Sequence, residues 1–260
     1  MNILCRRAFL PALLLFAFAA SAQAQQVGVI LMHGKWGTPQ GPIQATELAL
    51  KGAGFSVVSK EMPWSDRRAY DAGVDEVMSG LEGEVAKLRA AGARKIVVGG
   101  QSLGANMALA YAARHPDLDG LIMLSPGHTP ERFAGARGMA DSLAKARQLI
   151  SAGKGRSYAN FQDTNQGRTR EVSAYPAVYL SYFDPEGPAV MPINAAKLSR
   201  HTALLLVVGT KDRILADGTG YIFDRAPRNA YSAFRAIDAD HFNAPAESRR
   251  IVVDWVKGLP

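Results

Sequence analysis

The sequence contains a single cysteine, Cys5, which lies close to the amino terminus and ahead of an apolar run. No thiol follows it, so neither a disulfide framework nor a cysteine-based metal or nucleophile site is available to the rest of the chain. A cysteine that carries a lipid anchor follows the apolar run of its signal. Cys5 therefore does not predict a lipoprotein.

Motifs for metals and cofactors are missing as well. The chain has no H-E-x-x-H pair, no P-loop and no glycine-rich dinucleotide fingerprint. Residues 163–167 begin like a calcium loop, but the fifth position is Gly167 and the twelfth is not glutamate. We therefore expect no metal and no cofactor.

Long runs of one charge are also lacking. The formal net charge of +7 includes Arg6 and Arg7, and no long lysine or arginine run follows them. No helix-turn-helix, zinc or aromatic-platform pattern accompanies the basic excess, so we expect no nucleic-acid partner. The charge favours solubility.

The amino-terminal segment has the pattern of a secretory signal peptide over residues 1–24. Arg6 and Arg7 precede an apolar run that is short for a bilayer span, and small residues follow it. We predict cleavage after Ala24, with cleavage after Ala22 as the alternative. An uncleaved anchor or a buried helix is the other interpretation. The signal predicts a periplasmic or secreted protein with no stable membrane insertion after cleavage.

Residues 25–260 predict a single α/β domain, because short β-branched runs alternate with longer helical patterns. Such alternation is typical of a mostly parallel central sheet flanked by helices on both faces. The expected strands are 27–32, 55–59, 95–98, 120–124, 203–208 and 231–237, and the expected helices are 43–52, 70–91, 103–114, a segment near 218–224, and 245–257.

The alternation stops for about 75 residues between Ser125 and Ala203, where an ordinary crossover needs only a dozen or so. We interpret residues 128–200, approximately, as a lid or cap insertion. It contains a predicted amphipathic helix over 139–150 and a polar stretch over 151–173. Aromatic side chains over 175–183 predict lid packing, with substrate contact as the alternative.

A G-x-S-x-G motif, from Gly100 to Gly104, lies between an expected strand and an expected helix. The motif alone arises by chance in roughly one chain in ten. Its context is more specific, because a serine on a tight strand-to-helix turn is lifted above the sheet and the flanking glycines leave room for the turn. Ser102 is therefore the candidate nucleophile, and the alternative is an incidental serine in a buried turn.

The motif, its flanking elements and the order of the later strands and loops resemble the α/β-hydrolase fold superfamily, in its serine hydrolase, esterase- or lipase-like branch. The resemblance implies a triad in the order serine, acid, histidine, each on a loop after a strand. It assigns the acid to Asp212 and the base to His241, which follow the expected strands 203–208 and 231–237. Asp184 is the alternative acid, and Asp212 as a mere helix cap is the other interpretation.

The resemblance also implies an oxyanion hole made of two backbone N–H groups. One belongs to Leu103, after the nucleophile, and the other to Lys35, after the His33-Gly34 pair, with Trp36 as second choice. A plain turn is the alternative for the second group. The side chains of Trp36 and Gln101 are candidate substrate contacts.

These residues together predict a serine hydrolase that acts on a carboxylic ester or related small-molecule acyl substrate through an acyl-enzyme intermediate. A thioesterase, amidase or peptidase of the same fold is the nearest alternative. A hydrolase-fold protein that binds without catalysis is the alternative from another class.

Overall fold

The computed structural model describes residues 27–136 and 138–260, so the predicted signal peptide lies outside the described part of the chain. Among the described helices, none combines the length and the apolar character that a membrane crossing requires.

Six parallel strands form the central sheet, in the order β2-β1-β3-β4-β7-β8. The chain runs from β1 outward to β2 and then returns to β3 on the other side of β1. This reversal is a topological switch point, and the carboxyl ends of strands at such a point border a crevice where ligands bind. The strands are β1 Val27–Met32, β2 Ser56–Ser59, β3 Lys95–Ser102, β4 Gly120–Pro126, β7 Ala203–Gly209 and β8 Ala233–Ile237.

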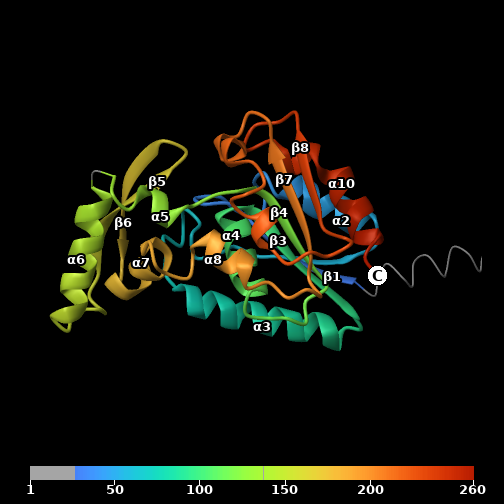
Figure 1. The fold of residues 1–260 in the computed structure, drawn as a ribbon. Helices are drawn as coiled ribbons and strands as arrows, with labels where there is room; N and C mark the ends of the chain where they lie inside the picture. The colour runs from blue at the N-terminus through green and yellow to red at the C-terminus, as the bar shows by residue number, and fades with distance from the viewer. Residues whose placement is uncertain (1–26, 137) are drawn as a thin grey trace, which may run out of the picture.

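Helices cover both faces of the sheet (Figure 1). Because strand side chains alternate between faces, Ile30 and Val98 pack in one buried cluster while Val29 and Val97 pack in another. The first cluster includes α3 Val74–Ala90 and α4 Leu103–Ala112, and the second is covered by α2 Gln44–Gly52 and α10 Arg249–Lys257. The short helix α9 Ala244–Glu247 contacts β4 and β7. The α/β class predicted from the sequence is confirmed.

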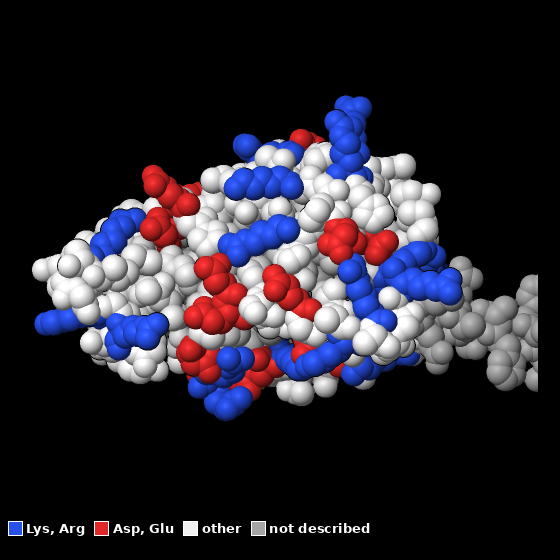
Figure 2. Space-filling model, turned by 90° about the horizontal axis from the view of Figure 1, so that it is seen from below, with Lys and Arg blue, Asp and Glu red and all other residues white. Residues whose placement is uncertain are grey.

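The outward face of α3 carries mixed charge. Lys60 and Lys87 both pair with Glu84, and Arg114 pairs with Asp75. Seen from below, acidic and basic side chains are interspersed over this side of the molecule (Figure 2). Such a pattern is typical of a solvated helix face.

Residues 127–202, which we call the insertion, join β4 to β7. Residues 130–136 and 138–183 form the lobe at the left of Figure 1, whereas residues 191–196 lie beside α4. The buried aromatic side chains Phe161, Tyr179 and Phe183 of the insertion belong to the same hydrophobic cluster as the sheet residues Ile30 and Val98. The insertion therefore packs as a continuation of the main core. Its elements are α5 Pro130–Phe133, α6 Met139–Ser151, β5 Ala159–Asn165, β6 Arg168–Ala174, α7 Pro176–Phe183 and α8 Met191–Ala196.

The largest difference from the sequence prediction is the antiparallel hairpin β5–β6, which occupies the polar stretch 151–173. Its two turn residues, Gln166 and Gly167, have φ values of 48° and 80°. Positive φ at both central residues is the geometry of a tight hairpin turn whose twist matches the strands.

Two predicted helices also differ. Near residues 218–224 the chain forms only short 3-10 turns, Arg213–Asp217 and Phe223–Arg225, so the predicted α-helix there is wrong. The helix predicted to begin at Tyr70 begins instead at Val74, because Ala69 and Tyr70 have φ values of 46° and 61°, outside the helical region.

The glycines of the G-x-S-x-G motif permit close packing of α4 on β1. A Cβ on Gly104 would lie 2.3 Å from the Met32 carbonyl oxygen, whereas a Cβ on Gly83, on the exposed face of α3, would meet nothing within 4 Å. Gly104→Ala should therefore lower the free energy of unfolding by about 3 kcal/mol or more. Gly83→Ala should raise it by about 0.5–1 kcal/mol. Urea denaturation checks both, and equal effects would contradict the packing argument.

Candidate active site

The structure brings Ser102, Asp212 and His241 together at the carboxyl ends of β3, β7 and β8. The His241 Nε2 atom lies 3.0 Å from Ser102 Oγ, and its Nδ1 atom lies 2.7 Å from Asp212 Oδ2. The exposed fractions of Ser102, Asp212 and His241 are 4%, 7% and 6%, respectively. The three side chains form a continuous, nearly buried chain of hydrogen bonds.

The ionisation state of Asp212 determines which atoms of the triad carry protons. Burial raises the pKa of Asp212, but hydrogen bonds from His241 and from the Ile214 N–H lower it by more, so its pKa is below the usual value. An ionised carboxylate accepts hydrogen bonds only, so Nδ1 of His241 carries a proton and donates it. The Nε2 lone pair is then free to accept the Ser102 hydroxyl proton.

Ser102 has the strained backbone of a sharp turn, with φ 56° and ψ −121°. Non-glycine residues in such conformations are held by their surroundings and occur often at functional sites. Gly127, after β4, keeps the approach open, because a Cβ there would lie 2.8 Å from Ser102 Oγ. Sequence reasoning missed Gly127.

The two N–H groups predicted for the oxyanion hole belong to the residue after Ser102 and to the loop after β1. The Leu103 N–H is in the first turn of α4, where amides have no partner within the helix. The Lys35 N–H has no hydrogen-bond partner among residues 27–136 and 138–260. The second choice, Trp36, is corrected, because its N–H donates to the Trp64 carbonyl at 2.9 Å.

A cavity of about 340 Å³ opens over the triad. Besides Ser102 and His241, four segments line it: the loop after β1, the loop after β4 with α5, the tip of the β5–β6 hairpin, and the loop after β7. The lining is mixed in character, with apolar Phe133 and Ile214, polar Asn165 and Gln166, and the guanidinium of Arg213.

The two predicted substrate contacts do not line this cavity. Gln101 is 2% exposed and donates from Nε2 to the His241 carbonyl at 3.2 Å, so it holds the loop that carries His241. The Trp36 ring lies under the Arg170 guanidinium, 4.2 Å from it, and Nε1 donates to Asp163. Both assignments are therefore corrected.

Asp184, the alternative acid, lies at the end of α7, away from His241. It pairs with Arg147 at 3.2 Å and accepts the Glu186 N–H at 3.0 Å. These bonds hold Asp184 within the insertion, so the structure does not support Asp184 as the acid of the triad.

His33 holds the loop after β1. Its Nε2 accepts the Met62 N–H at 2.9 Å, so the proton lies on Nδ1, which donates to the Gly34 carbonyl at 2.8 Å. Sequence reasoning also missed Asp163, a fully buried carboxylate of β5 that contacts this loop. A detectable signal was Gly167, since glycine favours a two-residue hairpin turn, together with Phe161, which shares a strand face with Asp163 because the two are two residues apart.

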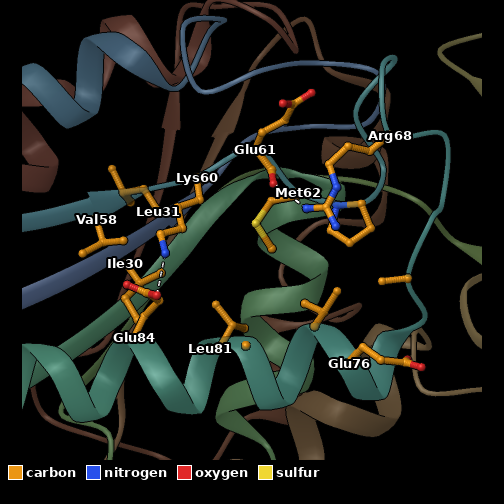
Figure 3. A pocket seen from close by; sticks show the side chains of 14 residues that line it. Ile30, Leu31, Val58, Lys60, Glu61, Met62, Arg68, Glu76, Leu81 and Glu84 are labelled. Atoms are coloured by element: carbon orange, nitrogen blue, oxygen red, sulfur yellow. Dashed lines mark hydrogen bonds and ion pairs between the residues drawn. The ribbon is translucent and has the colours of Figure 1, made fainter.

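A second cavity, of about 220 Å³, lies between the sheet and α3, away from the triad (Figure 3). The apolar side chains of Ile30, Met62 and Leu81 line this cavity, and the ion pair between Lys60 and Glu84 lies at one side of it. No triad residue lines it.

Acid should destabilise the fold through two neutral histidines. Burial lowers the pKa of His33 and of His128, whose Nε2 donates to the Tyr182 carbonyl at 2.7 Å while Nδ1 has no partner in the described structure. Below about pH 6.5 the unfolded chain binds protons that the folded protein excludes. The free energy of unfolding should therefore fall as pH drops from 6.5, approaching about 1.4 kcal/mol per pH unit for each histidine.

Chemical denaturation at pH 7.5 and 5.5 measures this loss. His128→Asn, which tolerates the positive φ of 68° at this position, should reduce the difference in unfolding free energy between the two pH values. The exposed His201 is the matched control, and His201→Gln should leave the difference unchanged. An unaltered difference in His128→Asn would contradict the neutral state of His128.

The comparisons with known proteins identify the family of this fold. A sequence profile for the alpha/beta hydrolase fold matches residues 47–226. The chain belongs to the α/β-hydrolase fold family. The family resemblance inferred from the G-x-S-x-G motif is thereby confirmed. No curated protein sequence matches the chain significantly.

Solved structures of the same fold cover nearly the whole α/β-hydrolase chain. A monoacylglycerol lipase from Paleococcus ferrophilus is 23% identical, with a TM-score of 0.62 over 88% of this chain and 93% of the lipase. Est1E from Butyrivibrio proteoclasticus is 14% identical, with a TM-score of 0.59 over 90% of each chain. A thioesterase domain from the curacin biosynthetic pathway is 14% identical, with a TM-score of 0.58 over 89% of this chain and 91% of that domain. At these identities the likeness establishes the fold.

Proposed function

We propose that the protein is a serine hydrolase that cleaves a carboxylic ester through an acyl-enzyme intermediate. The proposal rests on two buried hydrogen bonds beside an open cavity. One joins Ser102 Oγ to His241 Nε2 at 3.0 Å, and the other joins His241 Nδ1 to Asp212 Oδ2 at 2.7 Å. A nucleophile hydrogen-bonded to a base that is itself oriented by an acid is the arrangement that activates serine.

Ser102 Oγ attacks the ester carbonyl carbon while its proton moves to His241 Nε2. The carbonyl oxygen becomes an oxyanion and accepts hydrogen bonds from the Leu103 and Lys35 N–H groups. Collapse of this intermediate breaks the ester bond, and the alcohol leaves with the proton from Nε2. Water, deprotonated by His241 Nε2, then attacks the acyl-enzyme. The bond to Ser102 Oγ breaks, the carboxylic acid is released, and Oγ regains its proton from Nε2. Asp212 orients the imidazole and stabilises its charged form.

The mixed lining of the cavity favours a small acyl ester with polar substituents over a long hydrocarbon chain. Thioesters and amides use the same chemistry, and the structural likeness to a thioesterase domain keeps the thioester as the second candidate. We further propose that the protein acts in the periplasm or outside the cell, after removal of residues 1–24.

Fluorophosphonate labelling tests the proposal. The folded protein should gain one adduct, located on Ser102 by peptide mapping, and should hydrolyse p-nitrophenyl acetate. A series of matched oxygen esters, thioesters and amides then ranks the substrate classes. A folded protein that neither labels nor hydrolyses any of them would support a binding protein without catalysis.

A further inference from the structure

The most constrained polar group of the insertion is the carboxylate of Asp163, in β5. It has no exposed surface. A buried carboxylate is strongly destabilising unless it is both paired with a positive charge and fully hydrogen-bonded. The groups that donate hydrogen bonds to Asp163 therefore identify the part of the protein that β5 contacts here.

Three donors satisfy it, and all three come from outside the insertion. Lys35 Nζ lies 2.6 Å from Oδ1, while Trp36 Nε1 and the Tyr70 hydroxyl lie 2.7 and 2.9 Å from Oδ2. Burial and the Asp163 carboxylate both raise the pKa of Tyr70, so its hydroxyl stays protonated as a donor. Two of the three donors are consecutive residues of the loop after β1.

The Lys35 side chain is only 2% exposed, and its ammonium group is held within the protein. Besides Asp163 it donates to the Thr164 carbonyl at 2.8 Å, and it lies 4.9 Å from the centre of the Phe183 ring. Burial lowers the pKa of Lys35, and the Asp163 carboxylate opposes that shift. This side chain is therefore unavailable to a substrate, and its contacts instead fix the loop that carries it.

The backbone of the same loop is fixed at successive peptide groups. The Gly34 carbonyl accepts bonds from His33 Nδ1 at 2.8 Å and from the Gly37 N–H at 3.1 Å. In a trans peptide the N–H points opposite to the carbonyl, so these bonds direct the Lys35 N–H the other way. The Lys35 carbonyl in turn accepts a bond from Asn165 Nδ2 at 3.2 Å.

Trp36 is the strained point of the loop, with a φ of 59°. A non-glycine residue keeps such a conformation only where neighbouring groups hold it. The bond from Trp36 Nε1 to Asp163 is one of those restraints, and the bond from its N–H to the Trp64 carbonyl at 2.9 Å is another. Loss of the carboxylate would release both Lys35 and Trp36 at once.

We propose that Asp163 is a positioning residue for the oxyanion hole. By binding the side chains of Lys35 and Trp36, it holds the loop after β1 in the backbone conformation that leaves the Lys35 N–H directed to the cavity beside Ser102. The inference rests on the proposed hydrolase function. This role for Asp163 also makes the insertion a rigid part of the active site.

Asp163→Asn tests this role, because it keeps the shape of the side chain and removes the charge. Loss of one oxyanion donor lowers kcat by about 10²–10³-fold, and partial release of the loop should lower it by about 10–100-fold. The KM for p-nitrophenyl acetate should stay within about threefold, since the donor acts mainly in the transition state. A trifluoromethyl ketone, whose hemiketal oxygen occupies the oxyanion hole, should bind more weakly by the same factor as kcat/KM falls.

The exposed ion pair between Arg147 and Asp184 provides a matched control, because it also involves a carboxylate of the insertion but shares no hydrogen bond or ion pair with the loop after β1 in the described part of the chain. Asp184→Asn should leave kcat, KM and the inhibition constant within about threefold. A double variant, Lys35→Met with Asp163→Asn, removes the unpaired ammonium and should restore thermal stability. Its kcat should stay low, because Trp36 and Tyr70 still lack the carboxylate.

The outcomes separate the two proposals. A kcat within twofold of the unmodified protein in folded Asp163→Asn, or full recovery of kcat in the double variant, would overturn the positioning role alone. Failure of the unmodified protein to react with a fluorophosphonate would overturn the hydrolase proposal and this one with it. Should Asp163→Asn not fold, the double variant provides the same measurement of kcat and of the inhibition constant.

Discussion

Ser102→Ala should lower kcat for p-nitrophenyl acetate by about 10⁴–10⁶-fold, because no other group is placed to form the acyl-enzyme. His241→Ala should cost about as much, since without Nε2 the Ser102 hydroxyl keeps its proton. The double variant should be no worse than either single variant, because residues that act as a unit have non-additive effects. Steady-state kinetics on the folded variants measure these losses.

Ser157 and His201, both exposed, offer matched controls for these substitutions. Ser157→Ala and His201→Ala should leave kcat within about twofold, because surface substitutions away from the cavity alter little. More than about one per cent of the original kcat in Ser102→Ala, after contaminating activity is removed, would contradict the nucleophile assignment.

Asp212→Asn should lower kcat by about 10³–10⁴-fold. The amide of asparagine can donate to Nδ1 of His241, which would then hold the imidazole in the opposite tautomer, with the proton on Nε2. That nitrogen could no longer accept the Ser102 proton. The loss should appear mainly in kcat, since the Asp212 side chain is only 3% exposed and acts on the reaction through His241.

Asp184→Asn is the discriminating control, since Asp184 is the other carboxylate that the sequence allowed as the acid. It removes the bond to Arg147 within the insertion and should change kcat by less than about threefold. The reverse pattern, a silent Asp212→Asn and a severe Asp184→Asn, would show that the acid had been assigned wrongly.

Much of the fold was predictable because it depends on local patterns. The apolar runs of β1, β3 and β7 and the helical spacing in α3 are visible within short windows of sequence. The G-x-S-x-G motif predicted a strand-to-helix turn at Ser102, and the turn is present with positive φ. The order of the remaining strands then indicated the loops of Asp212 and His241.

The hairpin β5–β6 was not predicted, because its strands are largely polar and few of their side chains are buried. Phe161 and Asp163 point inward from β5, and an inward carboxylate hides the alternation that marks a strand. The roles suggested for Trp36 and Gln101 were wrong for a related reason. Their contacts, with Trp64, Asp163 and the His241 carbonyl, come from distant parts of the chain.

The sequence by itself determined the parallel sheet, the helices on its two faces and the turn that presents Ser102, because periodicity and closely spaced glycines act over a few residues. Only the tertiary structure decided that Asp212 faces His241, that the Lys35 N–H stays unpaired in the described structure, and that Asp163 binds the loop after β1. Those features depend on distances and burial between side chains far apart in sequence, which no local pattern encodes.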